Sequence, residues 1–284
     1  MARLSISETT TFRWSLEDDV THYSAAGIPA VGVWRHKLSD CGLPAARTFL
    51  RDAGLKVSHL SWAGGFTGSD GRSHRESIDD AADAIRTAGE LECPTLVVYS
   101  GSRGGHTVRH ARRLFQEALA ELAPLADEQR VTLAVKPMHP GCAAEWTFLT
   151  SLDDTLALLA AVGHPRVKMV LDTYHLGFAG PTDHLPRQVD NLPHDADDLP
   201  QKVAEAAPQV ALVQLGDARR PPNGEQNRCR LGEGVVPLRP IVAALQAAGY
   251  DGDYDVELLG EEFESADYCT LLEHAKTAFR SLVE

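Results

Sequence analysis

The sequence has no run of basic residues to offset its excess of acidic ones. Lysine and arginine number 27 against 40 aspartates and glutamates, which gives a formal net charge of −13. Nucleic acids and anionic membranes bind positively charged surfaces, so this charge argues against both as partners. No apolar run approaches the roughly 20 residues of a membrane-spanning helix. Residues 1–8 contain no long apolar segment of the kind found in secretory signals.

Cysteine pairs and a nucleotide fingerprint are also missing. The five cysteines are scattered singly, with no CxxC pair, as Cys41, Cys93, Cys142, Cys229 and Cys269. Their odd number and wide spacing predict reduced thiols in a cytoplasmic protein. No glycine-rich fingerprint follows the first apolar segment, which disfavours a doubly wound nucleotide-binding sheet, the second fold to consider.

What the sequence does contain is an eightfold alternation of strand and helix patterns. Apolar, β-branched runs predict strands at 3–7, 30–34, 56–62, 95–99, 131–135, 167–172, 210–215 and 253–258. Helix patterns lie between or after them, at 14–26, 44–53, 73–92, 108–128, 151–161, 199–207, 238–248 and 265–283. Eight such units in 284 residues predict one α/β domain over residues 1–284, a (β/α)8 TIM barrel.

One irregular segment and one helix start stand out in this pattern. The segment at about 177–198 is rich in Pro, Asp and His and is long for a strand–helix connection, so we expect a lid or a partner surface there. Ser15, ahead of Glu17 and Asp18, predicts the cap of the first helix.

Polar residues end most of the predicted strands. In a (β/α)8 barrel the carboxyl ends of all strands open into one cavity, where the active site lies. The segment 167–175 shows the pattern, because its apolar run ends in Asp172 and His175. Polar groups beside aromatic faces suit a small sugar or polyol. The candidates for substrate binding are Trp34, His59, Trp62, Tyr99 and His139. The plainer interpretation is that Asp172 caps a turn and the histidines satisfy loop backbones.

The order of these strand ends resembles the xylose-isomerase-like TIM barrel superfamily, also called the sugar phosphate isomerase/epimerase family. The resemblance covers nearly the whole chain and rests on five blocks, at 134–140, 171–175, 213–217, 230–234 and 255–257. It implies the barrel fold. It does not choose a reaction, because the family includes epimerases, aldose–ketose isomerases, dehydratases, lyases and endonucleases.

In typical members a divalent metal is held by Glu, Asp, His and Glu at strands five to eight. By this resemblance Asp172 and Glu257 are retained, Gln214 takes the histidine position, and Lys136 takes that of the first glutamate. An amide oxygen can bind Mg²⁺ or Mn²⁺. A protonated ammonium has no lone pair and repels the ion. We therefore expect no cofactor and an altered site in which Lys136 replaces the cation. The alternative is a Mn or Mg ion held by Asp172, Gln214 and Glu257, with Lys136 turned away.

The resemblance then implies chemistry at the carbon next to a carbonyl. Glu257 is the expected base, Lys136 the group that stabilises the enolate oxygen, and His175 or His139 the acid. Arg228 or Arg230 resembles the family arginine that binds substrate oxygen. The alternatives are a lyase or dehydratase of the same family, and a non-catalytic barrel that binds sugar or a partner subunit. The substrate, its phosphorylation and the oligomeric state, a homo-oligomer included, stay open.

Overall fold

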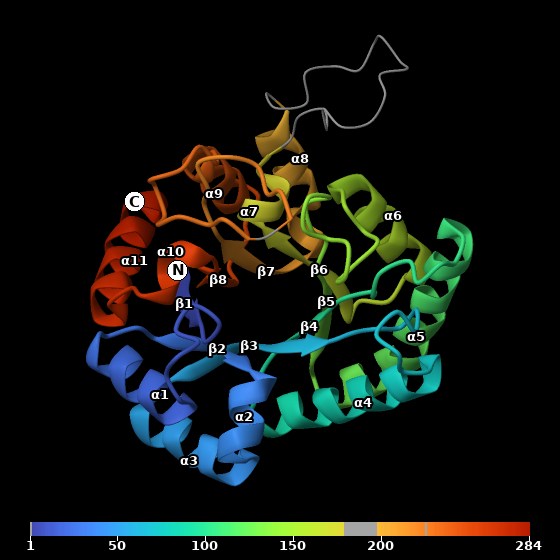
Figure 1. Ribbon diagram of the computed structural model, residues 1–284, viewed down its shortest axis with the longest axis horizontal. Helices are drawn as coiled ribbons and strands as arrows, with labels where there is room; N and C mark the ends of the chain where they lie inside the picture. The colour runs from blue at the N-terminus through green and yellow to red at the C-terminus, as the bar shows by residue number, and fades with distance from the viewer. Residues whose placement is uncertain (1, 179–197, 225) are drawn as a thin grey trace.

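The computed structural model describes residues 2–178, 198–224 and 226–284 and has eight parallel strands in a closed barrel, in chain order (Figure 1). This confirms the predicted (β/α)8 fold. The strands are β1 (Arg3–Ser7), β2 (Ala30–Trp34), β3 (Lys56–Ala63), β4 (Thr95–Val98), β5 (Thr132–Val135), β6 (Val167–Asp172), β7 (Val210–Leu215) and β8 (Asp253–Val256). Pairing of β1 with β8, from Arg3 opposite Asp253 to Ile6 opposite Val256, closes the barrel.

Helices surround the barrel on the outside (Figure 1). The long ones follow the predicted positions: α1 (Leu16–Ala25), α3 (Leu43–Ala53), α4 (His74–Glu90), α5 (Val108–Glu128), α6 (Leu152–Val162), α8 (Leu199–Ala206), α9 (Leu238–Ala247) and α11 (Tyr268–Val283). Short helices were not predicted: α2 (Arg35–Cys41), α7 (Thr173–Leu176), α10 (Glu261–Glu264) and the 3-10 turn η1 (Ala207–Gln209). Most of the predicted segment 177–198 lies outside the described residues.

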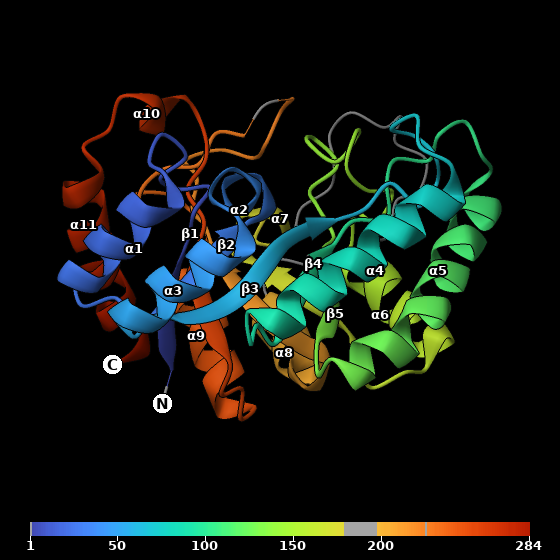
Figure 2. The ribbon, with the colours of Figure 1, turned by 90° about the horizontal axis from the view of Figure 1, so that it is seen from below.

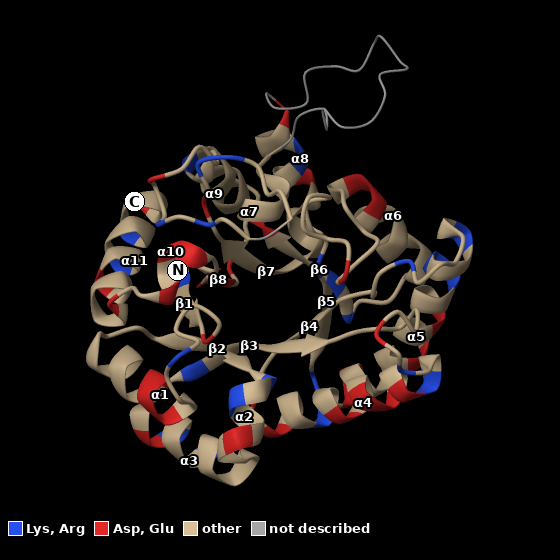
Figure 3. Cartoon of the chain, in the orientation of Figure 1, with Lys and Arg blue, Asp and Glu red and all other residues tan. Residues whose placement is uncertain are grey.

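Charged residues lie on the outer surfaces of the helices. Figure 3 shows acidic residues on α1, and acidic residues with arginines among them along α4. Among the residues that the structure describes, no helix is long and apolar enough to cross a membrane. Seen from the side, the chain begins at the lower end of the barrel, and α10 and the long loops lie at the opposite end (Figure 2).

The barrel interior is half apolar and half polar. Alternate residues of a strand point to opposite faces. The small inner cluster comes from β4 to β7 and includes Val97, Ala134, Val170 and Leu212, whereas their strand neighbours pack against the helices. The opposite half is lined by polar residues that are fully or almost fully buried: Ser5, Ser58, His59, Gln214 and Asp255. Such groups are costly to bury unless they are paired, so the polar half of the barrel is a place to look for function.

A second buried polar cluster lies between β1 and the helix layer. Glu8 follows β1, has no exposed surface and accepts a hydrogen bond from the Trp34 backbone N–H at 2.7 Å. Lys37 forms a buried ion pair with Asp19 beside it. Burial, followed by the negative charge of Asp19, raises the pKa of Glu8 to about 8. The folded protein therefore holds a proton on Glu8 that the unfolded chain gives up at a lower pH.

This proton makes stability fall as pH rises. Between the ordinary pKa of glutamate and about 8 the folded state binds more protons than the unfolded state, so wild-type stability is lost across that range. Glu8→Gln removes the titration. We expect the free energy of unfolding of Glu8→Gln, minus that of wild type, to increase by about 2–4 kcal/mol between pH 5 and pH 9. Urea unfolding measures both values. Glu17→Gln, an exposed change on α1, is the control; an equal gain in both variants contradicts the account.

Candidate active site

Four strands and one loop bring the candidate site together at the carboxyl end of the barrel. Lys136 follows β5, Asp172 ends β6, Gln214 lies in β7 and Glu257 follows β8. Arg228 comes from the loop between β7 and α9. Each of these side chains is at most 8% exposed. The (β/α)8 topology alone explains why residues more than a hundred positions apart meet here.

Two cations hold the two carboxylates. Lys136 Nζ lies 3.0 Å from Asp172 Oδ2 and 2.8 Å from Glu257 Oε2. Arg228 Nη2 lies 3.1 Å and 2.8 Å from the same two oxygens. The guanidinium also stacks on the ring of Tyr174, 4.1 Å from its centroid. The four charged groups therefore form a closed square of ion pairs with no net charge, which offsets the cost of burying them.

The pKa values follow from this square. Burial acts to lower the pKa of Lys136, but Glu257, Tyr99 and Asp172 outweigh it and raise the pKa above its ordinary value. Burial likewise opposes the charge on Asp172, yet Arg228 and Lys136 bring its pKa well below the usual range. At neutral pH Lys136 is a cation and Asp172 an anion.

Asp172 performs both roles that the sequence left open. Its Oδ1 accepts hydrogen bonds from the backbone N–H groups of Tyr174 at 2.9 Å and His175 at 3.3 Å, which caps α7. Its Oδ2 faces Lys136 and Arg228. The cap fixes the carboxylate so that one oxygen points at the cations.

A layer of polar groups lies below the square. Gln214 Nε2 is 3.3 Å from Glu257 Oε1 and 3.4 Å from Asp255 Oδ2. Burial, and then the charge of Glu257, raise the pKa of Asp255 well above its ordinary value. His59 is completely buried, with Nδ1 3.0 Å from Ser58 Oγ, and burial lowers its pKa to about 3. Its ring packs so closely on Gly32 that a Cβ there would lie 2.0 Å from Cε1.

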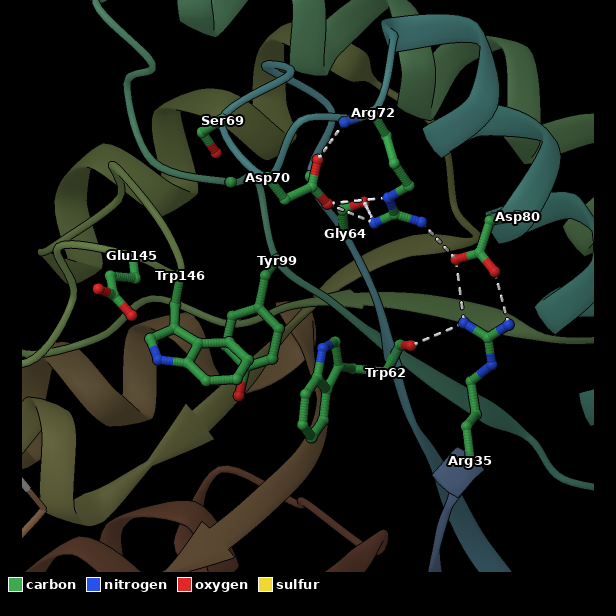
Figure 4. A pocket seen from close by; sticks show the side chains of 12 residues that line it. Arg35, Trp62, Gly64, Ser69, Asp70, Arg72, Asp80, Tyr99, Glu145 and Trp146 are labelled. Atoms are coloured by element: carbon green, nitrogen blue, oxygen red, sulfur yellow. Dashed lines mark hydrogen bonds and ion pairs between the residues drawn. The ribbon is translucent and has the colours of Figure 1, made fainter. Parts of the chain in front are cut away.

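Three aromatic side chains, two of them predicted to bind substrate, lie beside the square. Trp62, Tyr99 and Trp146 pack edge-on or tilted, with ring centroids 5.0 to 6.0 Å apart. They line a cavity of about 410 Å³ whose other side is a row of ion pairs from Arg35 to Asp80 to Arg72 (Figure 4). The charge of Lys136 acts on the Tyr99 hydroxyl against the effect of burial, which places this cavity next to the ion pairs.

The remaining residues predicted to bind substrate are Trp34, His139, His59 and Arg228. Trp34 stacks near Trp62, with centroids 6.4 Å apart, and half-buried His139 accepts a hydrogen bond from the Gly141 N–H. Both lie around the site, and their contact with substrate stays a prediction. His59 was expected at a strand end, but β3 continues to Ala63 and leaves His59 inside the barrel. Between the two candidate arginines, the structure places Arg228 on the carboxylates.

Sequence reasoning missed the partners of two site residues. Asp255 stands two positions before Glu257 within the predicted strand 253–258. Because alternate residues of a strand point to the same face, both could have been placed on the inner face of the barrel. Cys142 Sγ lies 3.6 Å from His175 Nδ1. No local sequence pattern predicts this contact, because it joins the loop after β5 to α7.

The residues present do not fit a divalent ion held by Asp172, Gln214 and Glu257. The oxygens that would face the ion already face Lys136 and Arg228. Gln214 turns its amide nitrogen, which has no free lone pair, toward Glu257. Over the ranges that the structure describes, there is no group of three His, Cys, Asp or Glu residues suited to a metal.

Known proteins share this fold and part of this sequence. A putative hydroxypyruvate isomerase of Streptomyces coelicolor is 26% identical over 250 residues, 81% of this chain and 80% of that protein. An inosose isomerase of Bacillus velezensis is 22% identical over 231 residues, 80% and 75% of the two chains. A protein of Sinorhizobium meliloti 1021 superposes with a TM-score of 0.85 at 25% identity, covering 99% and 98%.

A solved structure of the IOLI protein, with a binding zinc atom, gives a TM-score of 0.80 at 18% identity, covering 99% of this chain and 98% of that one. At this identity the likeness concerns the fold. The family described as "Xylose isomerase-like TIM barrel" matches residues 20–280. Together with the closed eight-stranded barrel, this match shows that the chain belongs to the xylose isomerase-like TIM barrel family.

Proposed function

We propose that this protein is an isomerase or epimerase of a sugar or related keto-polyol, acting by proton abstraction next to a carbonyl without a metal ion. The relatives support the reaction class, since three of them are named isomerases. Structures named L-ribulose 3-epimerase and D-psicose 3-epimerase share the fold. The observation that carries the metal-free part is the pair of cations, Lys136 and Arg228, on Glu257 Oε2.

Glu257 is the base because one of its oxygens remains reactive. Oε2 accepts hydrogen bonds from both cations, which fix the carboxylate in place. Within the part of the chain that the structure describes, Oε1 has only the 3.3 Å contact with the Gln214 amide. A fixed carboxylate with one lightly bound oxygen can remove a proton from the carbon next to a carbonyl. Lys136 is not the base, because its pKa is raised and it stays protonated.

The two cations stabilise the enolate. Before reaction they balance two carboxylates. Proton transfer neutralises Glu257 and moves the negative charge to the substrate oxygen. Lys136 and Arg228 then have one buried carboxylate fewer to balance, so their attraction for the new oxyanion increases during the step. This is stabilisation of the transition state rather than of the bound substrate.

His175 is the group that completes the reaction. Burial lowers the pKa of its imidazole well below the ordinary value, so the ring is neutral. Its Nε2 lies 3.7 Å from Asp172 Oδ2, at the edge of the square. A neutral imidazole there can donate a hydrogen bond to a substrate oxygen and pass a proton between neighbouring oxygens.

Deuterium exchange tests the proposal directly. Protein treated with chelator is incubated in D2O with a panel of ketoses and aldoses, and NMR follows deuterium at the carbon next to the carbonyl. We expect exchange and interconversion for at least one sugar, at a rate that added Mn²⁺ leaves unchanged. Binding of a sugar without exchange would favour a non-catalytic barrel, and a strict requirement for metal would overturn the metal-free site.

A further inference from the structure

We infer that Cys142 is a positioning residue that holds His175 in the tautomer with its proton on Nε2. The thiol lies in the loop between β5 and α6, and its Sγ is 3.6 Å from His175 Nδ1. That distance is within hydrogen-bonding range for sulfur. The effect on catalysis rests on the function proposed above, whereas the tautomer itself does not.

The imidazole sits between a thiol and a carboxylate. Nδ1 faces Cys142, and Nε2 faces Asp172 Oδ2 at 3.7 Å. The His175 side chain has no exposed surface, and its Nε2 has no hydrogen-bond partner among the described residues. The ring is fully buried, and Lys136 and Arg228 already balance the charge of Asp172 beside it, so a further positive charge on the imidazole is unfavourable and only one of its two nitrogens carries a proton.

Only one placement of that proton suits both neighbours. With the proton on Nδ1, the bare lone pair of Nε2 would face the negative charge of Asp172, which is repulsive. With the proton on Nε2, the N–H points toward the carboxylate and Nδ1 is free to accept a hydrogen bond. The group in place to donate is the Cys142 thiol, whose pKa burial raises to about 11, so it keeps its proton. The hydrogen bond at one ring nitrogen thus selects the state of the other.

A second acceptor, a backbone carbonyl, lies within reach of the Cys142 thiol. Cys142 Sγ also lies 3.6 Å from the carbonyl oxygen of His139. If the thiol donated only there, Nδ1 would have no donor and the charge of Asp172 alone would keep the proton on Nε2. Removing the thiol distinguishes the two cases, because the tautomer ratio changes only if the thiol donates to Nδ1.

The unsatisfied Nε2–H is then a donor held ready for substrate. At 3.7 Å it does not form a full hydrogen bond with Asp172. A substrate oxygen placed between them would accept it, next to the cations that bind the enolate. Cys142 does not touch the reacting atoms in this arrangement; it acts through His175.

Nitrogen NMR reads the tautomer without any turnover. In protein with 15N-labelled histidine, His175 is assigned by the loss of its signals in His175→Gln. We expect the wild-type Nδ1 to resonate as an acceptor and Nε2 as a protonated nitrogen. Cys142→Ala should shift the tautomer ratio toward Nδ1–H by about fivefold, the equivalent of one neutral hydrogen bond. Cys142→Ser, which keeps a donor, should restore the wild-type ratio.

The chain offers a matched control. Cys269 Sγ lies 3.8 Å from His22 Nδ1 on the exposed surface, so Cys269→Ala removes a similar contact far from the site and should leave the His175 signals unchanged. A wild-type His175 protonated on Nδ1, or a ratio that Cys142→Ala leaves unchanged, overturns the inference. If the ratio shifts as expected but wild-type protein exchanges no deuterium into any sugar, the positioning role stands and the proposed function fails.

Turnover provides the second measurement. The fall in kcat in Cys142→Ala cannot exceed the fivefold shift in tautomer ratio and is smaller the more Nε2–H predominates in wild type, so we expect a loss of less than fivefold, recovered in Cys142→Ser. Equal losses in the two variants would mean that the thiol only fills space, and would contradict a role for its proton.

Discussion

Replacing Glu257 with glutamine is expected to reduce turnover by about 10³-fold. Positioned general bases contribute roughly 10²–10⁴ to rate, and the neutral amide of this variant cannot take a proton. The amide oxygen can still accept a hydrogen bond from Lys136 or Arg228, so the shape of the site is conserved. The loss comes from the missing base, because Lys136 and Arg228 can stabilise an enolate only after a proton has been removed from the substrate.

Separate measurements of sugar binding and of deuterium exchange distinguish a role of Glu257 in proton transfer from a role in substrate binding. Sugar binding by Glu257→Gln is measured by calorimetry, deuterium exchange by NMR, and folding by thermal unfolding. Glu264→Gln, an exposed change on α10, is the control and should match wild type in all three. Unchanged exchange in the Glu257 variant contradicts the proton-transfer mechanism. Loss of binding together with loss of exchange, in a folded variant, would instead assign Glu257 to substrate binding.

Strand positions were predictable from sequence because they depend on local composition and period. Ser15 accepts a hydrogen bond from the Asp18 N–H and forms the capping box at the start of α1. The short helices were not predictable in the same way. α2 starts directly after β2, with Trp34 at the cap position and no side-chain cap. Lys37, which lies in α2, is buried against Asp19 in the helix layer.

The site was predictable where it depends on strand ends and not where it depends on loops. Lys136, Asp172 and Glu257 meet because β5, β6 and β8 end at the same rim. Their meeting follows from topology, and the distances of 2.8 and 3.0 Å agree with it. Arg228 could not be chosen over Arg230 from sequence, since only the folded loop decides which one turns inward. The contact between Cys142 and His175 depends in the same way on two loops packing together.

The reverse substitution, Lys136→Glu, is expected to create a divalent metal site. Wild-type Lys136 and Arg228 balance Asp172 and Glu257. The substitution removes one positive charge and adds one negative charge. The buried group then lacks two positive charges, which is the charge of one Mn²⁺ or Mg²⁺ ion. Three carboxylates and, after rotation of its amide, the Gln214 oxygen are ligands that these ions accept.

The metal should therefore stabilise this variant and not the wild type. At about 100 times the dissociation constant, an ion that binds only the folded state adds about 2.7 kcal/mol, so Mn²⁺ should raise the Tm of Lys136→Glu by about 4–5 °C. Elemental analysis should find about one ion per chain. Lys136→Gln, which removes the cation without adding a carboxylate, is the matched control and should bind much more weakly. If wild-type protein retains one tightly bound ion, the cations do not occupy its place. If Lys136→Glu binds none, charge is not what excludes the metal.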